Sequence, residues 1–302
     1  MKEDIGTVLN KGFGTWIRNL NICVPFIFEF MMTILLSVLA MFFFVILFIV
    51  PVISERNIDP EHLTPESILG IMGSVFSGNI IPMLLLGLVF LLVYMFIQSF
   101  FMAGAIGMSK EASEKGDSRV ADMIFYGMKN VKNLFFTKIM VSLLVLAGVI
   151  FLLPGILSIG DLDIFLANPE NAIASTSLLT FGALLWTLYI IALSIVLLFV
   201  EHVIVIEELD PVTAIEKGFS FFLSNKLHTF ILWSVLIGIS LLLSLIGNFL
   251  GSVELLAQLW ELFNYVLTIV VIQPLVTIWW TRFYLNRTDR KLYSFRDYVL
   301  TH

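Results

Sequence analysis

The sequence predicts an all-α polytopic integral membrane protein with six transmembrane helices, three cytoplasmic interfacial amphipathic helices and a threefold internal repeat. Composition is the first reason, since 59% of the 302 residues are hydrophobic and 13% are charged, with a mean hydropathy of +0.99. An ordinary soluble domain carries about 25% charged residues, so the composition excludes one. The other reasons are six long apolar runs and a glycine-centred segment that recurs before every second run.

Each of the six apolar runs is long enough to cross a bilayer, because a helix needs roughly 18 or more apolar residues to span about 30 Å of hydrocarbon. The expected spans are 21–53, 79–108, 134–158, 176–206, 227–250 and 257–285. The first, second and fourth are longer than a straight crossing requires. We therefore expect these three to tilt or to extend beyond the headgroups.

The basic residues orient the chain in the membrane. With these spans, sixteen of the 17 Lys and Arg residues fall on one side, and Arg56 is the exception. Basic residues in short loops are retained in the cytoplasm. We therefore expect a multi-pass protein of the cell membrane with both termini cytoplasmic, a basic cytoplasmic tail at 287–302, and outer loops at 55–78 and 159–175.

A similar segment precedes the first, third and fifth spans. VLNKGFGTWIRN (8–19) and AIEKGFSFFLSN (214–225) share Lys-Gly-Phe, an aromatic residue four positions after the glycine, and Asn at the seventh position. MIFYGMKNVKN (123–133) is a weaker copy. This recurrence predicts one membrane domain, residues 1–302, built from repeated two-span units. The expected units are 1–108, 109–208 and 209–286.

Each copy has the pattern of an amphipathic helix, because its apolar residues fall on one face at 3.6 residues per turn. We expect helices at 3–19, 118–132 and 211–224 that lie nearly parallel to the membrane. Asp210-Pro211 is the expected start of the third helix, and Asp117-Ser118 offers a similar cap for the second. The three two-span units should be related by rotation about the membrane normal.

Three glycines occupy the same position in the three copies: Gly12, Gly127 and Gly218. A glycine inside a helix costs about 1 kcal/mol relative to alanine, so three in one register indicate close packing against a neighbouring helix. The alternative is that the helices only anchor their spans at the headgroup boundary and that the glycines coincide by chance.

Ionisable side chains within spans are the best pointers to function, because burying a charge in hydrocarbon costs at least about 2.5 kcal/mol. The candidate buried polar or ion-pairing residues are Glu29, Lys138, Glu201, His202, His228 and Gln273. Lys138 and Arg282 lie near span ends and are expected to reach the lipid phosphates. Glu29 lies deeper, so we expect it to be buried and paired with a cation from the cytoplasmic side, Lys138 first.

No catalytic, cofactor-binding or metal-binding site is predicted. The histidines do not stand at metal-ligand spacing, and the single Cys23 excludes an intrachain disulfide and a Cys-x-x-Cys site. No phosphate-binding loop motif is present. An intramembrane enzyme is therefore the least favoured function, because no acid–base or nucleophile pairing is visible.

The stretches Ile5-Gly6, Gly12-Phe13 and Glu207-Glu208 through Asn225 resemble a loose group of prokaryotic multi-pass proteins. The group includes the membrane domain joined to some glycerophosphodiester phosphodiesterases and several uncharacterised archaeal and bacterial families. The resemblance rests on helix order, the acidic pair that ends the fourth span, and the Ala-Ile, Gly-Phe and Asn pattern. It implies a six-span fold without catalytic residues, because the active site of such fusions belongs to a separate soluble barrel.

Two classes of function fit these features. The first is a non-enzymatic membrane protein that organises lipids or partner proteins at the cytoplasmic face. The alternative is a permease subunit or small transporter with a polar path near Glu29 and Glu201, indicated if Glu29 opens onto a cavity shared with Glu201 or Gln273. Secondary transporters commonly have twofold inverted repeats and mid-membrane sites, which favours the first class here. We expect membrane lipids and a protein at the cytoplasmic face as partners, and no nucleic acid.

Overall fold

The computed structural model describes residues 2–55, 65–159 and 173–293. These residues form helices, and none of them lies in a strand. Six helices in this part of the chain are long and apolar enough to cross a membrane, which confirms the six predicted spans. Their bounds are Leu20–Ser54, Gly78–Lys115, Val120–Ser158, Ile173–Glu207, Lys226–Leu250 and Glu254–Arg287.

Short 3-10 or π segments, or a turn, interrupt four of the six spans. The elements are α1 (Ile5–Arg18), η1 (Leu20–Cys23), α2 (Val24–Phe44), η2 (Val45–Ile49), α3 (Val50–Glu55), α4 (Pro65–Lys115), α5 (Val120–Ala147), η4 (Gly148–Leu152), α6 (Leu153–Ser158), α8 (Ile173–Val196), α9 (Val200–Glu207), α10 (Pro211–Ser224), α11 (Lys226–Leu250), α12 (Glu254–Leu267), η6 (Thr268–Ile272) and α13 (Gln273–Arg287).

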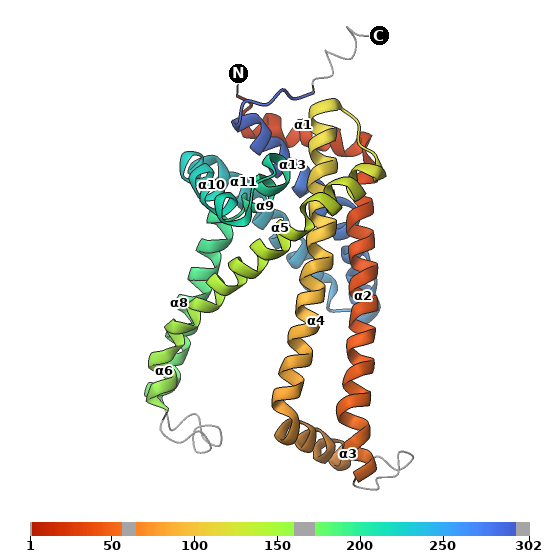
Figure 1. Ribbon diagram of the computed structural model, residues 1–302, viewed down its shortest axis with the longest axis vertical. Helices are drawn as coiled ribbons and strands as arrows, with labels where there is room; N and C mark the ends of the chain where they lie inside the picture. The colour runs from red at the N-terminus through yellow and green to blue at the C-terminus, as the bar shows by residue number, and fades with distance from the viewer. Residues whose placement is uncertain (1, 56–64, 160–172, 294–302) are drawn as a thin grey trace.

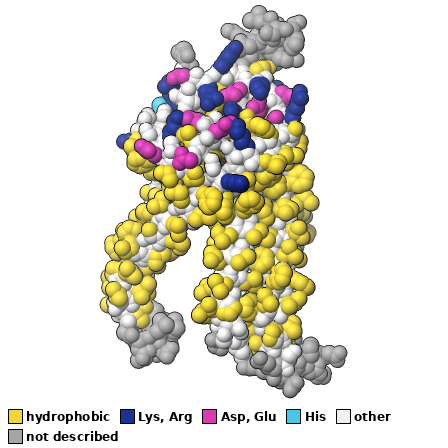
Figure 2. Space-filling view, viewed as in Figure 1, with side chains coloured by type: hydrophobic (Ala, Val, Ile, Leu, Met, Phe, Trp, Pro, Cys, Tyr) yellow, Lys and Arg dark blue, Asp and Glu magenta, His cyan; other side chains and the backbone are white. Residues whose placement is uncertain are grey.

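The helices form a head and three legs. The head comprises α1, α9, α10, α13 and the adjoining ends of α4 and α5. The legs are the packed pairs α2–α4, α5/α6–α8 and α11–α12. Figure 1 shows the first two pairs diverging from the head, where the described chain both begins and ends. Charged side chains gather on the head, and hydrophobic side chains cover the legs (Figure 2).

The centre of the head is an aromatic core where the second, fourth and sixth spans end. Here α4, α9 and α13 contact one another. The ring of Phe199, which lies just before α9, stands 5.3 Å from the ring of Trp280 and 5.7 Å from that of Phe283. All three side chains are buried. Because large aromatic side chains carry much of the apolar area that a fold buries, this core fixes the spans relative to one another.

The helices α1 and α10 begin and end alike, and each has 14 residues. At their starts, Asp4 and Asp210 accept a hydrogen bond from the backbone N–H three residues on, at 3.1 and 3.2 Å. At their ends, the side chains of Asn19 and Asn225 donate to the carbonyl four residues back, at 2.9 and 3.0 Å. The backbone leaves helical geometry at both asparagines, so each helix is separated from the span that follows it.

The second copy does not form a separate helix. Residues 120–132 of the predicted helix 118–132 belong to α5, which continues without a break into the third span, so the prediction of a distinct interfacial helix is wrong here. Leu134 stands at the position of the asparagines that end α1 and α10, and nothing diverts the backbone there. The cap also differs from the expected Asp117-Ser118: the helix starts after Arg119, whose backbone N–H donates to Asp122 at 2.7 Å.

The outer ends of the legs are only partly described. The expected loop 55–78 is helical from Pro65 onward, where α4 begins, and α4 bends at Asn79 (φ −128°, ψ 21°). Residues 56–64 of that loop, most of the expected loop 159–175, and the last part of the tail 287–302 lie outside the described residues.

Candidate functional site

The three candidate glycines each lie against a helix of another span. A Cβ added to any of them would stand within 3 Å of a neighbouring side chain, which is closer than real Cβ atoms approach. The nearest atoms are Trp279 Cδ1 at 2.4 Å from Gly12, Phe100 Cε2 at 2.8 Å from Gly127, and Val200 Cγ2 at 2.8 Å from Gly218. Gly127 thus contacts the second span, Gly218 the fourth span and Gly12 the sixth span.

The start of the chain is joined to the last span by a buried ion pair. Arg282 donates to the Glu3 carboxylate through Nε at 3.0 Å and Nη2 at 2.8 Å. The expectation that Arg282 reaches lipid phosphates is therefore wrong, because its side chain is only 2% exposed. Burial raises the pKa of Glu3, but hydrogen bonds and positive charge from Arg282 and Lys11 outweigh burial and hold this pKa below its ordinary value of 4.5.

A cavity of about 570 Å³ lies beneath the head, between α4, α5, α8, α9 and α13. Much of its wall is aliphatic. The polar and ionisable side chains that line it are Tyr94, Gln98, Thr137, Lys138, Ser142, Ser194, Glu201, His202 and Thr277. Because all of these helices belong to the membrane spans, the cavity combines an apolar wall with a few polar groups, as ligand sites in proteins commonly do.

Lys138 forms its ion pair with Glu201, at 3.4 Å, and not with Glu29 as expected. Glu29 is half-buried, interacts with the amide of Gln98, and lies within range of the charges of Lys138 and Glu201. Lys138 therefore has one paired carboxylate, Glu201, and a second carboxylate, Glu29, acts on it only at longer range. Sequence reasoning identified these charged residues but not their pairing, since the choice between two carboxylates depends on distances of a few ångströms.

His202 contributes an unpartnered ring to the cavity wall. Its side chain is 6% exposed, and neither ring nitrogen has a hydrogen-bond partner among the described residues. The Leu198 carbonyl lies near the ring, but the geometry does not complete a normal hydrogen bond. A buried polar group without a partner costs roughly 1–3 kcal/mol, so this ring offers a nitrogen donor and a nitrogen acceptor to a ligand.

The two remaining candidates lie away from this cavity. Gln273 is exposed at the start of α13, and His228 is half-buried in α11. Neither lines the cavity, and Glu201 is the one member of the expected trio Glu29, Glu201 and Gln273 that does. Thr277 was missed by sequence reasoning; its hydroxyl donates to the Gln273 carbonyl at 2.9 Å. Only its spacing of one helical turn from Gln273 could have indicated it.

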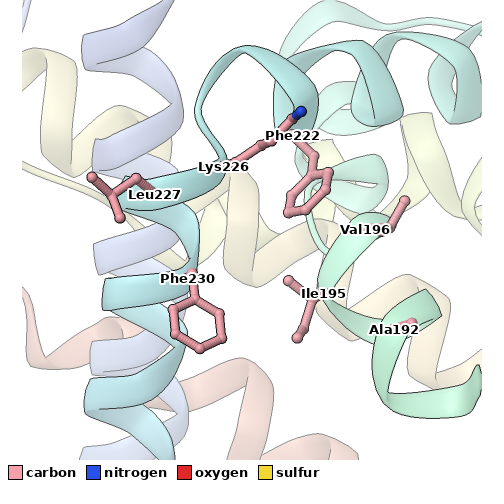
Figure 3. Close-up of a pocket in the computed structure, with 7 residues that line it drawn as sticks. All are labelled: Ala192, Ile195, Val196, Phe222, Lys226, Leu227 and Phe230. Carbon is pink, nitrogen blue, oxygen red and sulfur yellow. The ribbon is translucent and has the colours of Figure 1, made fainter. Parts of the chain in front are cut away.

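A second hollow lies on another face of α8 and is almost entirely apolar. It has a volume of about 480 Å³ and is lined by side chains of α8, α10 and the start of α11. Figure 3 shows Ile195 and Phe230 facing it from opposite sides, with the Lys226 nitrogen at its upper rim beside Phe222. The hollow therefore opens between two legs and has one cation at its edge.

No family model matches this chain, and neither a curated protein nor a solved structure does. The resemblance to the membrane domain of glycerophosphodiester phosphodiesterases therefore stays a prediction. Within the described residues, no group of three or more metal-ligating side chains comes together. The conclusions about function consequently depend on the geometry of the two hollows and of the head.

Proposed function

We propose that this protein is a non-enzymatic membrane protein that organises lipid at the cytoplasmic face of the cell membrane by holding it between diverging pairs of spans. The observation that carries the proposal is the cavity beneath the head, which joins an aliphatic wall to the Lys138–Glu201 pair. An amphiphile matches both kinds of surface, since its acyl chain fits the wall and its headgroup reaches the charges.

The head supplies the proposed contact with the membrane surface. α1 exposes Phe13 and Ile17, and α10 exposes Phe219 and Leu223, each at 44% or more. Apolar side chains on an otherwise polar helix suit the boundary between headgroups and acyl chains. The basic residues favour a cytoplasmic position for the head and for both termini of this chain.

The threefold repeat is part of this proposal, with each unit contributing one leg. The matched caps of α1 and α10 support equivalence of the first and third units. The contacts of the three glycines support it for all three units, because each glycine packs on the second span of the unit before it. In a ring of three units, the spaces between neighbouring legs are open to lipid from the side.

Native mass spectrometry of the detergent-purified protein tests the lipid function. We expect lipid to remain bound at a fixed stoichiometry. Ser194→Trp places a large ring into the cavity and should release that lipid. Ser37→Trp is the matched control, because Ser37 is exposed on α2 away from the cavity. Absence of retained lipid, or equal retention in the two variants, would refute the proposal.

A permease or small transporter is the second candidate, favoured by the breaks in the spans. The fourth span is interrupted between Val196 and Val200, beside the Lys138–Glu201 pair, and discontinuous helices are typical of transporter binding sites. A separate polar groove of about 540 Å³, lined in part by Ser244 and Asn248, lies between α11 and α12. Solute or proton flux in proteoliposomes that Glu201→Gln abolishes would support transport over lipid organisation.

A further inference from the structure

The wall of the cavity carries one charge of each sign. Lys138 and Glu201, which form an ion pair at 3.4 Å, both line it. Among the described residues, no other lysine or arginine lines the cavity. Charges within spans are stable when opposite charges compensate them, so a ligand that approaches this pair matches it best when it carries a group of each sign.

The same wall also offers donors. The Lys138 ammonium has three hydrogens, its side chain is 13% exposed, and its closest partner is the Glu201 oxygen at 3.4 Å. It can therefore donate to an anionic group of a ligand while it stays beside Glu201. His202 adds two ring nitrogens that have no partner and line the same cavity, one able to donate and one able to accept.

Glu201, an acceptor for a cation, thus lies 3.4 Å from Lys138, a donor for an anion, next to a hydrocarbon-like wall. That wall includes Leu91, Met95, Val141, Val145 and Leu193. A phospholipid whose phosphate is linked to a primary ammonium has matching groups in the same order: an ammonium with three hydrogens, a phosphate, and acyl chains. A quaternary ammonium lacks the hydrogens, and a purely anionic headgroup lacks the cation.

We propose that the central cavity selects an aminophospholipid of the ethanolamine type, with its ammonium on Glu201 and the acceptor nitrogen of His202, and its phosphate on Lys138. This assignment rests on the proposed lipid function and names the headgroup for it. The neutral imidazole can serve the ligand without a change in charge, because it has one donor and one acceptor.

Competition between lipids of identical acyl chains tests the assignment. The protein is placed in mixed micelles with equal amounts of phosphatidylethanolamine, phosphatidylcholine and phosphatidylglycerol. The lipids that stay bound are identified and quantified by native mass spectrometry. We expect at least about tenfold enrichment of phosphatidylethanolamine at one site, a difference of about 1.4 kcal/mol. Glu201→Gln should reduce that enrichment to about threefold or less, while Glu254→Gln, an exposed carboxylate on α12, should not change it.

Further variants and outcomes distinguish a failure of the headgroup assignment from a failure of the proposed lipid function. If Glu201→Gln does not fold, the double variant Lys138→Gln/Glu201→Gln keeps a neutral pair and should also lose the preference. Equal retention of the three lipids, or preference for phosphatidylglycerol, overturns the headgroup assignment but leaves the lipid function standing. Retention of no lipid refutes the proposed function itself. Displacement of the lipid by soluble glycerophosphoethanolamine would identify a water-soluble ligand and also overturn the assignment.

Discussion

Both oxygens of the Glu3 carboxylate accept hydrogen bonds from the Arg282 guanidinium, which ties the first residues of the chain to the last span. The two side chains are 13% and 2% exposed, so the pair is largely withdrawn from water. Removing one partner from such a pair leaves a buried charge without compensation, which costs much more than the pair itself contributes. The closure of the head should therefore be sensitive to this carboxylate.

Replacing Glu3 by glutamine should lower the free energy of unfolding by about 1–3 kcal/mol, because the amide offers one neutral acceptor where two charged oxygens stood. Lys11→Gln is the control, since it removes only the exposed member of the Glu3 cluster, which is 46% exposed. Its effect should stay below about 1 kcal/mol. Thermal unfolding in detergent measures both; equal losses would argue against the importance of the buried pair.

The contribution of Glu3 should also depend on pH. Its pKa in the folded protein lies below the ordinary 4.5, so folding favours the ionised carboxylate. The stabilisation is then complete above 4.5 and is lost as the pH falls through the lower folded pKa. The stability difference between the unmodified protein and Glu3→Gln should be constant from pH 7 to about 5 and should shrink below about 4.5. A difference that grew on acidification would contradict this sign.

Gly12 and Gly14 provide a matched pair on one helix. A methyl group at Gly12 would meet Trp279, whose indole N–H is fixed by a 3.0 Å hydrogen bond to the Leu9 carbonyl, whereas nothing lies within 4 Å of a Cβ at Gly14. Gly12→Ala should therefore destabilise the protein by about 1–3 kcal/mol. Gly14→Ala should stabilise it by up to about 1 kcal/mol through helix propensity. Shifts of the unfolding midpoint in the same direction in both variants would contradict the close packing of Gly12.

The two carboxylates near Lys138 should differ in their effect on stability. Glu201→Gln removes the ion-pair partner of Lys138, whereas Glu29→Gln leaves that pair intact and keeps an amide beside Gln98. We expect Glu201→Gln to cost on the order of 1–3 kcal/mol and Glu29→Gln less than about 1 kcal/mol. Unfolding in detergent gives the order. A larger loss of stability from Glu29→Gln than from Glu201→Gln would instead support the Glu29–Lys138 pair expected from the sequence.

Compartment reporters fused at Ser67 and at His302 test the proposed topology. We expect the fusion at Ser67 to report the outside and the fusion at His302 to report the cytoplasm, because all but one of the basic residues lie on the expected cytoplasmic side. A reporter inserted after Asp117 serves as the internal control and should agree with His302. The same compartment for Ser67 and His302 would exclude six spans with cytoplasmic termini.

The spans could be predicted from sequence because hydropathy is local: the length of an apolar run limits the length of its helix. The ends of α1 and α10 were likewise readable, since Asp210 and the asparagines at 19 and 225 act on their own helix. The continuity of α5 was also encoded, by Leu134 in place of asparagine. The second copy was nevertheless expected to form a separate helix, because its overall resemblance to the other two copies was given more weight than the leucine at position 134.

The site was less accessible to sequence reasoning because its members come from distant parts of the chain. Lys138 and Glu201 could be selected as costly charges, but their separation depends on how α5 and α9 cross. Arg282 was assigned to lipid phosphates on its position near a span end, while its real partner, Glu3, belongs to the opposite end of the chain. Such pairings follow from the arrangement of the spans, which periodicity does not specify.

The contact of α1 with α13 has a consequence for biosynthesis. α1 is synthesised well before Trp279 and Arg282, which contact Gly12 and Glu3. Until the sixth span has been inserted, the face around Gly12 is uncovered and Glu3 has no guanidinium to bind. A nascent chain of this kind depends on the lipid surface or on chaperones during that interval. Chains that terminate before α13 should consequently be recognised by quality-control proteases through an undocked first helix.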